Sequence, residues 1–123
     1  MVKPLTVYKA SAGSGKTFTL ATEYIRLLVE NPQSYRTILA VTFTNKATEE
    51  MKMRILSQLY GIAHQLPDSE GYLKAIEERT GYKPQLISER AATALTNLLH
   101  NYNYFRVETI DTFFTSRSEE RRV

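Results

Sequence analysis

Residues 10–17 of the chain read Ala10-Ser11-Ala12-Gly13-Ser14-Gly15-Lys16-Thr17. Small residues let the backbone bend so that successive N–H groups point into one concavity, and a helix that starts near Lys16 adds the positive end of its dipole. In such loops the lysine reaches the β- and γ-phosphates of a nucleoside triphosphate, and the threonine hydroxyl binds Mg²⁺. The strict pattern begins with glycine, where this chain has Ala10. The stretch predicts a triphosphate site; the alternative is a Gly/Ser-rich turn that merely joins a strand to a helix.

The segments around this loop alternate between strand and helix patterns. Residues 5–9 alternate in polarity, which is typical of a short strand. Apolar residues then recur at three- and four-residue spacing from Phe18 to Leu28, which predicts an amphipathic helix ending near Asn31-Pro32. Residues 37–43 are nearly all apolar, as expected of a strand buried on both faces of a parallel sheet. Together these segments predict a βαβ unit.

The remainder of the chain is dominated by helical patterns. Asn45 is a good N-cap for a helix that runs into the sixties. A short helix around residues 72–76 should stop before Gly81, and residues 87–102 carry another amphipathic pattern. We therefore expect a helical excursion over residues 56–102.

A second strand pattern follows this helical excursion. Apolar and polar residues alternate over residues 105–109, and Asp111 is placed to cap a following helix. The alternation of elements predicts an α/β fold with a parallel sheet of at least three strands and helices on its faces. Residues 115–123 carry one aliphatic residue at the very end, so we expect a disordered polar tail.

The composition sets broad limits on the class of protein. With 123 residues, 42% of them hydrophobic, the chain can bury one core. It has no cysteine, which excludes disulfides and cysteine-based metal sites. The amino end lacks the apolar core of a signal peptide, and no apolar run approaches a membrane-spanning length, so we expect a cytoplasmic protein. The net charge of +3 comes from scattered residues and identifies no partner.

A second group of candidate residues follows the second predicted strand. Open α/β sheets bind ligands at the carboxyl ends of their strands. There Phe43 could stack a base, and polar groups of Thr42, Thr44 and Asn45 could hold a phosphate. The alternative is ordinary strand-to-helix chemistry, with Phe43 in the core and Asn45 as a cap.

Three ordered blocks of sequence resemble one family. Residues 8–20 and 38–51 look like the opening of a UvrD/Rep-type superfamily 1 DNA helicase, and the first block is closest to the RecB/AddA branch of helicase-nuclease subunits. Residues 107–114 resemble the Thr-Ile-His-Gly-Phe type motif of that branch, with Asp111 where histidine is usual. The resemblance implies a RecA-like P-loop NTPase fold of three layers, of which residues 1–114 would form part.

The resemblance also implies roles for the three blocks. The first would bind ATP with Mg²⁺, and the other two would touch single-stranded DNA. The DNA-binding residues would then be Thr42, Phe43, Thr44, Asn45, Thr109 and Asp111. At this position an imidazole could donate a hydrogen bond to a DNA phosphate, whereas the carboxylate of Asp111 would repel it. The departure at Asp111 therefore argues against a phosphate contact there. The implied partners are the remainder of a helicase polypeptide or a nuclease subunit.

Several groups that hydrolysis requires in that family have no counterpart here. They are an acidic pair for Mg²⁺ and water, a glutamine and arginines from a second motor domain. The chain has only two aspartates, Asp68 and Asp111. We therefore expect a truncated or frame-shifted start of a longer helicase that binds nucleotide without turning it over efficiently. The alternatives are a small P-loop kinase or other NTPase with Asp111 at the metal site, and a non-catalytic nucleotide-binding fragment.

Overall fold

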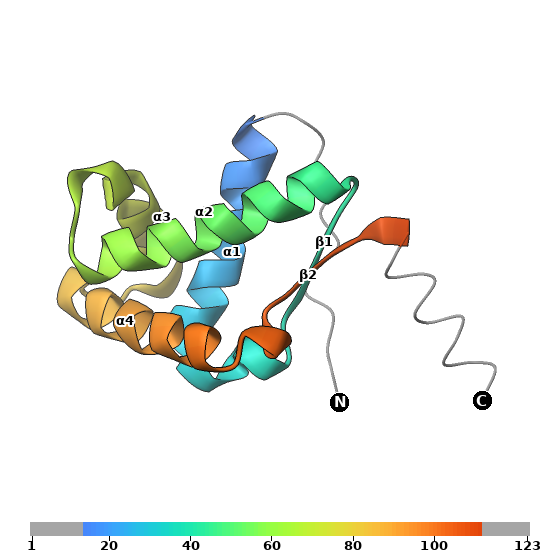
Figure 1. The fold of residues 1–123 in the computed structure, drawn as a ribbon. Helices are drawn as coiled ribbons and strands as arrows, with labels where there is room; N and C mark the ends of the chain where they lie inside the picture. Colours follow the sequence, from blue (N-terminus) through green and yellow to red (C-terminus); the bar gives the residue numbers. More distant parts are fainter. Residues whose placement is uncertain (1–13, 112–123) are drawn as a thin grey trace.

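A computed structural model describes residues 14–111, with side-chain surroundings from Phe18 onward (Figure 1). The predicted strand over residues 5–9 and the polar tail over 115–123 lie outside the described residues. Three short 3-10 turns, named η1 to η3, accompany the helices and strands. In chain order the elements are α1 (Ser14–Glu30), η1 (Pro32–Arg36), β1 (Leu39–Thr42), α2 (Asn45–Ala63), η2 (Pro67–Ser69), α3 (Glu70–Thr80), α4 (Pro84–His100), η3 (Tyr102–Tyr104) and β2 (Arg106–Thr109).

The described sheet consists of β1 and β2, which run parallel with Leu39 opposite Arg106 and Thr42 opposite Thr109. All four residues of β1 are buried, as the apolar run predicted. The strand begins two residues later and ends one residue earlier than the predicted 37–43. At its amino end, Thr37 belongs to the preceding turn, where its hydroxyl donates to the Ser34 carbonyl at 3.0 Å. Within residues 14–111 the fold is therefore mostly helical with a two-stranded parallel sheet, and a third strand stays a prediction.

The hydrophobic core lies between α1 and the three later helices. Helix α1 packs against α2, α3 and α4, and α2 also contacts both strands. The spacing of apolar residues in α1 predicted an amphipathic helix, and this is confirmed because one face of the helix is fully buried. The core side chains include Leu20, Tyr24, Ile25, Leu28, Met51, Ile55, Leu59, Ile62, Ile76, Ile87 and Leu98.

The range 56–102 contains helices, as predicted, and its turns explain where each helix ends. Helix α3 ends at Thr80 and is capped by Gly81, whose φ of 76° is left-handed and suits glycine. Helix α2 comes so close to η2 that a Cβ on Gly61 would overlap the Ser69 hydroxyl. Helix α4 ends at His100, so Tyr102 lies in η3 and not in the helix as predicted. That these helices form an insertion in a larger domain stays a prediction.

At the amino end of the sheet, the turns η1 and η3 meet through aromatic and cationic side chains. The rings of Tyr35 and Tyr104 pack edge to face with centroids 6.3 Å apart. The Arg36 guanidinium lies over both rings, 5.6 Å and 5.2 Å from their centroids. Because η1 leads into β1 and η3 leads into β2, this contact helps to align the two strands.

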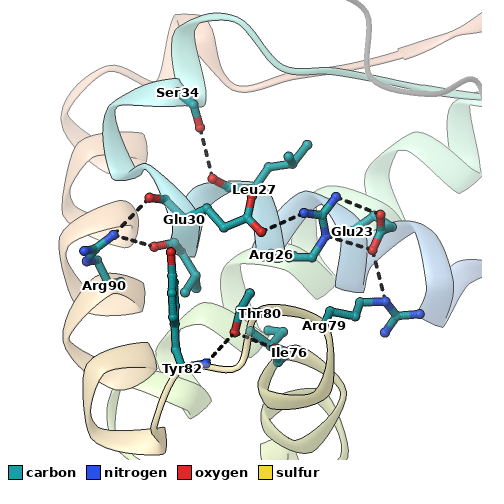
Figure 2. A network of polar contacts seen from close by, with 11 residues as sticks. Glu23, Arg26, Leu27, Glu30, Ser34, Ile76, Arg79, Thr80, Tyr82 and Arg90 are labelled. Carbon is teal, nitrogen blue, oxygen red and sulfur yellow. Dashed lines mark hydrogen bonds and ion pairs between the residues drawn. The ribbon is translucent and has the colours of Figure 1, made fainter.

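The carboxyl end of α1 is held by α4, and we call this contact the α1 junction (Val29, Glu30 and Pro32 with Arg90 and Asn97). Arg90 Nη1 donates to the carbonyls of Val29 at 2.9 Å and Glu30 at 3.0 Å (Figure 2). Asn97 Nδ2 donates to the Pro32 carbonyl at 3.0 Å. The last carbonyls of a helix have no partner inside the helix and carry partial negative charge, so a guanidinium satisfies and stabilises them.

A neighbouring ion-pair network joins α3 to α1. Arg26 contacts Glu23 at 3.0 Å and Glu30 at 2.8 Å, and Arg79 contacts Glu23 at 3.1 Å (Figure 2). The hydrogen bond to Glu23 raises the pKa of the Arg26 guanidinium, although partial burial opposes this. Figure 2 also shows Thr80 closing the end of α3, because its hydroxyl donates to the Ile76 carbonyl and accepts from the Tyr82 N–H.

Candidate functional site

The first candidate feature is the amino terminus of α1. Of the predicted phosphate loop, Ser14, Gly15, Lys16 and Thr17 form the first turn of this helix, and residues 10–13 lie outside the described residues. The helix begins two residues before the expected start. Its first N–H groups have no partner inside the helix, and the dipole is positive there, so the backbone favours an anion. Phosphate contacts of Lys16 and Thr17 stay a prediction.

The next residue along α1 anchors this turn to the helical part of the molecule. The rings of Phe18 and Tyr72 lie with centroids 4.5 Å apart, and Tyr72 belongs to α3. The Tyr72 hydroxyl in turn accepts a hydrogen bond from Arg54 at 3.2 Å. The candidate anion site at the amino terminus of α1 is therefore followed directly by Phe18, whose side chain packs on α3.

The second feature is the carboxyl edge of the sheet, which we define as residues 42–45 together with 109–111. Thr42 and Thr109 are paired in the parallel register, so the chain leaves both strands at the same edge. Across the strands, the Thr42 hydroxyl oxygen lies 3.4 Å from the Glu108 carbonyl oxygen. The structure thus brings together two predicted DNA-binding segments that are more than sixty residues apart.

The structure contradicts the alternative in which Phe43 lies in the core and Asn45 caps the helix. The Phe43 side chain is 42% exposed, so the alternative that placed it in the core is wrong. The N-cap of α2 is Thr44, not Asn45: Thr44 has an extended backbone, and its hydroxyl accepts from the Ala47 N–H at 3.0 Å. Asn45 is the exposed first residue of the helix.

The prediction that the Thr42 hydroxyl is available to a ligand is wrong. It is 1% exposed, and its hydroxyl lies 2.6 Å from the Thr48 hydroxyl and 3.3 Å from the Thr44 carbonyl. Thr109 is also buried, with 8% of its surface exposed. Both threonines are therefore covered at the edge, whereas Phe43 and Asn45 are exposed. DNA contacts of all these residues stay predictions.

Asp111 is exposed and lies inside the start of a helix that begins at Ile110. The sequence predicted that Asp111 caps this helix from the position before it, and that prediction is wrong. Among the described residues, no three or more histidine, cysteine or acidic side chains gather as metal ligands would. Asp111 is therefore not part of such a group within residues 14–111, and a metal role for it stays a prediction.

Sequence reasoning missed Thr48, which joins the end of β1 to the first turns of α2. Its hydroxyl donates to the Thr44 carbonyl at 3.1 Å, the four-residue back-bond typical of threonine in helices. That spacing could have revealed the bond to Thr44. The contact with Thr42 depends on how the strand enters the helix, and no local pattern predicts it.

Comparisons with known proteins cover the part of the chain that contains the three blocks. A family model of the UvrD/REP helicase N-terminal domain matches residues 2–116. RecBCD enzyme subunit RecB of Borreliella burgdorferi is 36% identical over 101 residues, which cover 82% of this chain and 8% of that protein. RecB of Escherichia coli is 37% identical over an alignment of 82 residues that covers 57% of this chain and 7% of that protein.

A helicase-nuclease protein of another bacterium is similar over a shorter range. This ATP-dependent helicase/nuclease subunit, from Thermoanaerobacter sp., is 44% identical over 63 residues, covering 50% of this chain and 5% of that protein. The chain thus spans less than a tenth of the length of these relatives. No solved structure matches it. No helix within residues 14–111 has the length and apolar character needed to cross a membrane. The match across all three blocks shows that the chain belongs to the UvrD/REP helicase N-terminal domain family.

Proposed function

We propose that this chain is the opening part of the ATP-binding domain of a DNA helicase, within a helicase-nuclease subunit. It would bind ATP-Mg²⁺ through residues 10–17 and single-stranded DNA through the carboxyl edge. The observation that carries the proposal is the family match over residues 2–116, which includes the phosphate loop and both DNA-binding segments. That match disfavours a small P-loop kinase.

The nucleotide half of the proposal follows from charge and backbone geometry. The triphosphate would lie against the backbone of residues 13–17, at the positive end of α1. Lys16 would supply the side-chain charge, and Thr17 would provide the protein ligand of Mg²⁺. The adenine, the attacking water and the transition-state charge need groups that these residues do not supply.

The DNA half follows from what the carboxyl edge exposes. Phe43 offers a half-exposed ring beside the exposed Asn45 at the start of α2. A base stacked on an aromatic ring contributes about 1–3 kcal/mol, whatever its identity. Asp111 lies at the same edge and repels phosphates, so the DNA backbone should pass on the side of Asn45. We expect weak binding by this chain alone.

Catalysis would depend on the remainder of a longer protein. An arginine finger alone raises the rate of related P-loop enzymes roughly 10³- to 10⁵-fold, and an acid pair and a water-orienting residue are needed as well. We therefore propose that the 123-residue chain binds ATP and hydrolyses it slowly. Its partners would be the remainder of the helicase polypeptide or a nuclease subunit, in the cytoplasm.

Calorimetric titration of the full chain with ATP and Mg²⁺ tests the nucleotide site. Lys16→Ala should abolish measurable binding because it removes the charge that faces the β- and γ-phosphates. Lys74→Ala is the matched control: it removes the same charge from a side chain that is 69% exposed and only loosely paired with Glu70, 3.4 Å away. Equal ATP affinity in Lys16→Ala and the unchanged chain would contradict the assignment.

Fluorescence anisotropy with a labelled oligothymidylate, at one fixed salt concentration, tests the DNA edge. Phe43→Ala should weaken binding roughly 5- to 150-fold if a base stacks on the ring. Tyr60→Ala is the control, because Tyr60 is a 51% exposed aromatic residue elsewhere on α2. If both variants bind DNA as the unchanged chain does, Phe43 is not a stacking platform. ATP hydrolysis with and without the oligonucleotide then separates a DNA-stimulated motor from a kinase or a silent fragment.

A further inference from the structure

We propose that Thr48 is a positioning residue that fixes the turn of Phe43 and Thr44 from within, and thereby sets the affinity of the carboxyl edge for single-stranded DNA. The inference rests on the proposed function of that edge. Thr48 itself would not touch DNA. It would act through Thr42 and Thr44, whose atoms it contacts directly.

The two threonine hydroxyls form a relay that spans the turn. Thr42 Oγ1 lies 2.6 Å from Thr48 Oγ1, and Thr48 Oγ1 lies 3.1 Å from the Thr44 carbonyl oxygen. With Thr42 donating to Thr48 and Thr48 donating to Thr44, each hydroxyl proton has one acceptor. The Thr44 carbonyl also accepts the Thr48 N–H at 3.0 Å. Both ends of the two-residue turn are therefore tied to one side chain.

This arrangement explains why Phe43 points outward. The residue before it, Thr42, is 1% exposed and cannot rotate without leaving a buried hydroxyl unsatisfied. The residue after it, Thr44, is held by its carbonyl and by the bond that its hydroxyl accepts from the Ala47 N–H. With both neighbours fixed, the backbone that carries the exposed ring is held in one conformation before any ligand arrives, which lowers the entropic cost of stacking a base.

The relay also connects the two segments of the carboxyl edge. Thr42 lies opposite Thr109, and its hydroxyl is 3.4 Å from the Glu108 carbonyl in β2. A turn released at Thr48 would therefore loosen the strand end that carries residues 110–111 as well. Thr93 offers a contrast: its hydroxyl makes the same four-residue back-bond to Glu89 at 3.2 Å, on an exposed part of α4.

The test uses Thr48→Val, which keeps the shape and removes the hydroxyl, and Thr48→Ser, which keeps the hydroxyl. Thr93→Val is the matched control for losing a helical back-bond. Oligothymidylate binding is measured by anisotropy, and hydrogen exchange is measured at the amides of Ala47 and Thr48. We expect Thr48→Val to weaken DNA binding roughly 3- to 10-fold and to speed exchange at both amides by a similar factor. Thr48→Ser and Thr93→Val should behave like the unchanged chain.

The outcomes separate this inference from the proposed function. Unchanged DNA affinity and exchange in Thr48→Val, with Phe43→Ala impaired, would overturn the role of Thr48 and leave the DNA edge intact. If Thr93→Val lowered DNA affinity as much as Thr48→Val, the role of Thr48 would also be overturned, because a general loss of helix stability would then explain both results. If the unchanged chain does not bind the oligonucleotide, the proposed function fails, and the link from Thr48 to DNA affinity fails with it. The exchange rates still decide whether Thr48 fixes the turn.

Discussion

The carboxyl edge and the α1 junction are both organised by polar side chains, but the bonds differ in their reach along the chain. At the edge, Thr42, Thr44 and Thr48 bond among themselves within seven consecutive residues. At the junction, Arg90 and Asn97 bond to carbonyls sixty or more residues earlier. The turn from β1 into α2 is therefore specified by one short segment of sequence, whereas the junction exists only after α4 has packed against α1.

This difference separates the structural work of the two regions. The junction closes the end of a helix whose apolar face forms much of the core, so its bonds should contribute mainly to the stability of the fold. The edge holds a turn with one exposed ring, so its bonds should contribute mainly to the shape offered to a ligand. Substitutions in the two regions should consequently have opposite profiles of stability and binding.

The largest effect should come from the hydrophobic core, to which α4 contributes. Leu98 of α4 is fully buried, and Leu98→Ala should lower the free energy of unfolding by about 2–5 kcal/mol because it leaves a cavity. Its neighbour Leu99 is 57% exposed, so Leu99→Ala should change stability by less than about 0.5 kcal/mol. Denaturant unfolding of the full chain measures both values. Similar costs at the two positions would mean that α4 does not pack as described.

Arg90→Met tests the polar part of the junction. It keeps much of the aliphatic stem and removes both bonds to the α1 carbonyls, so we expect a loss of about 1–3 kcal/mol in the free energy of unfolding. The control is Arg79→Met, which breaks a partly exposed ion pair with Glu23 and should cost about 1 kcal/mol or less. Oligothymidylate affinity should be unchanged in Arg90→Met. A loss of DNA affinity without a loss of stability would contradict the division between the two regions.

Tyr24 links the core to β2 and predicts how stability changes at high pH. Burial raises the pKa of the Tyr24 hydroxyl above its ordinary value, and the Arg106 backbone acts in the opposite direction. The folded state then holds the phenolic proton more tightly than the unfolded state. Its contribution is fully present below about pH 10 and is lost at about 1.4 kcal/mol per pH unit above that. Tyr24→Phe should flatten this alkaline decline in urea unfolding, and an identical decline in both chains would exclude Tyr24 as its source.

Much of the architecture could be predicted from sequence periodicity alone. The apolar residues of α1 and β1 are buried as their spacing indicated, because burial of an amphipathic face is the main force that forms such elements. The boundaries were less accurate. Thr37 looked like part of a strand, but its hydroxyl closes η1, since a threonine suits a strand and a turn equally well.

The site shows a sharper limit of prediction. The residues of the carboxyl edge were found because they lie in short recognisable blocks. Their individual environments were not, because Phe43 is apolar and yet exposed, and Thr42 is polar and yet buried. The Arg90 contacts carry no local signal at all. A guanidinium can satisfy any helix end within reach, and which end it reaches depends on how α4 packs.

The smallest effect on stability, and the sharpest test of the comparison, should come from Thr44→Ala. Removing an N-cap hydroxyl costs about 0.5–2 kcal/mol, but Asn45 follows directly and is itself a good cap. Helix α2 can therefore restart one residue later, which should hold the loss near the lower end of that range. The restart would move the backbone of the turn and with it Phe43. We thus expect DNA affinity to fall even though unfolding by denaturant is nearly unchanged. Thr44→Ser keeps the hydroxyl, so its DNA affinity and its stability should both equal those of the unchanged chain. A stability loss of about 2 kcal/mol with DNA affinity unchanged would show that Thr44 serves the fold as Arg90 does, and the contrast between the edge and the junction would then disappear.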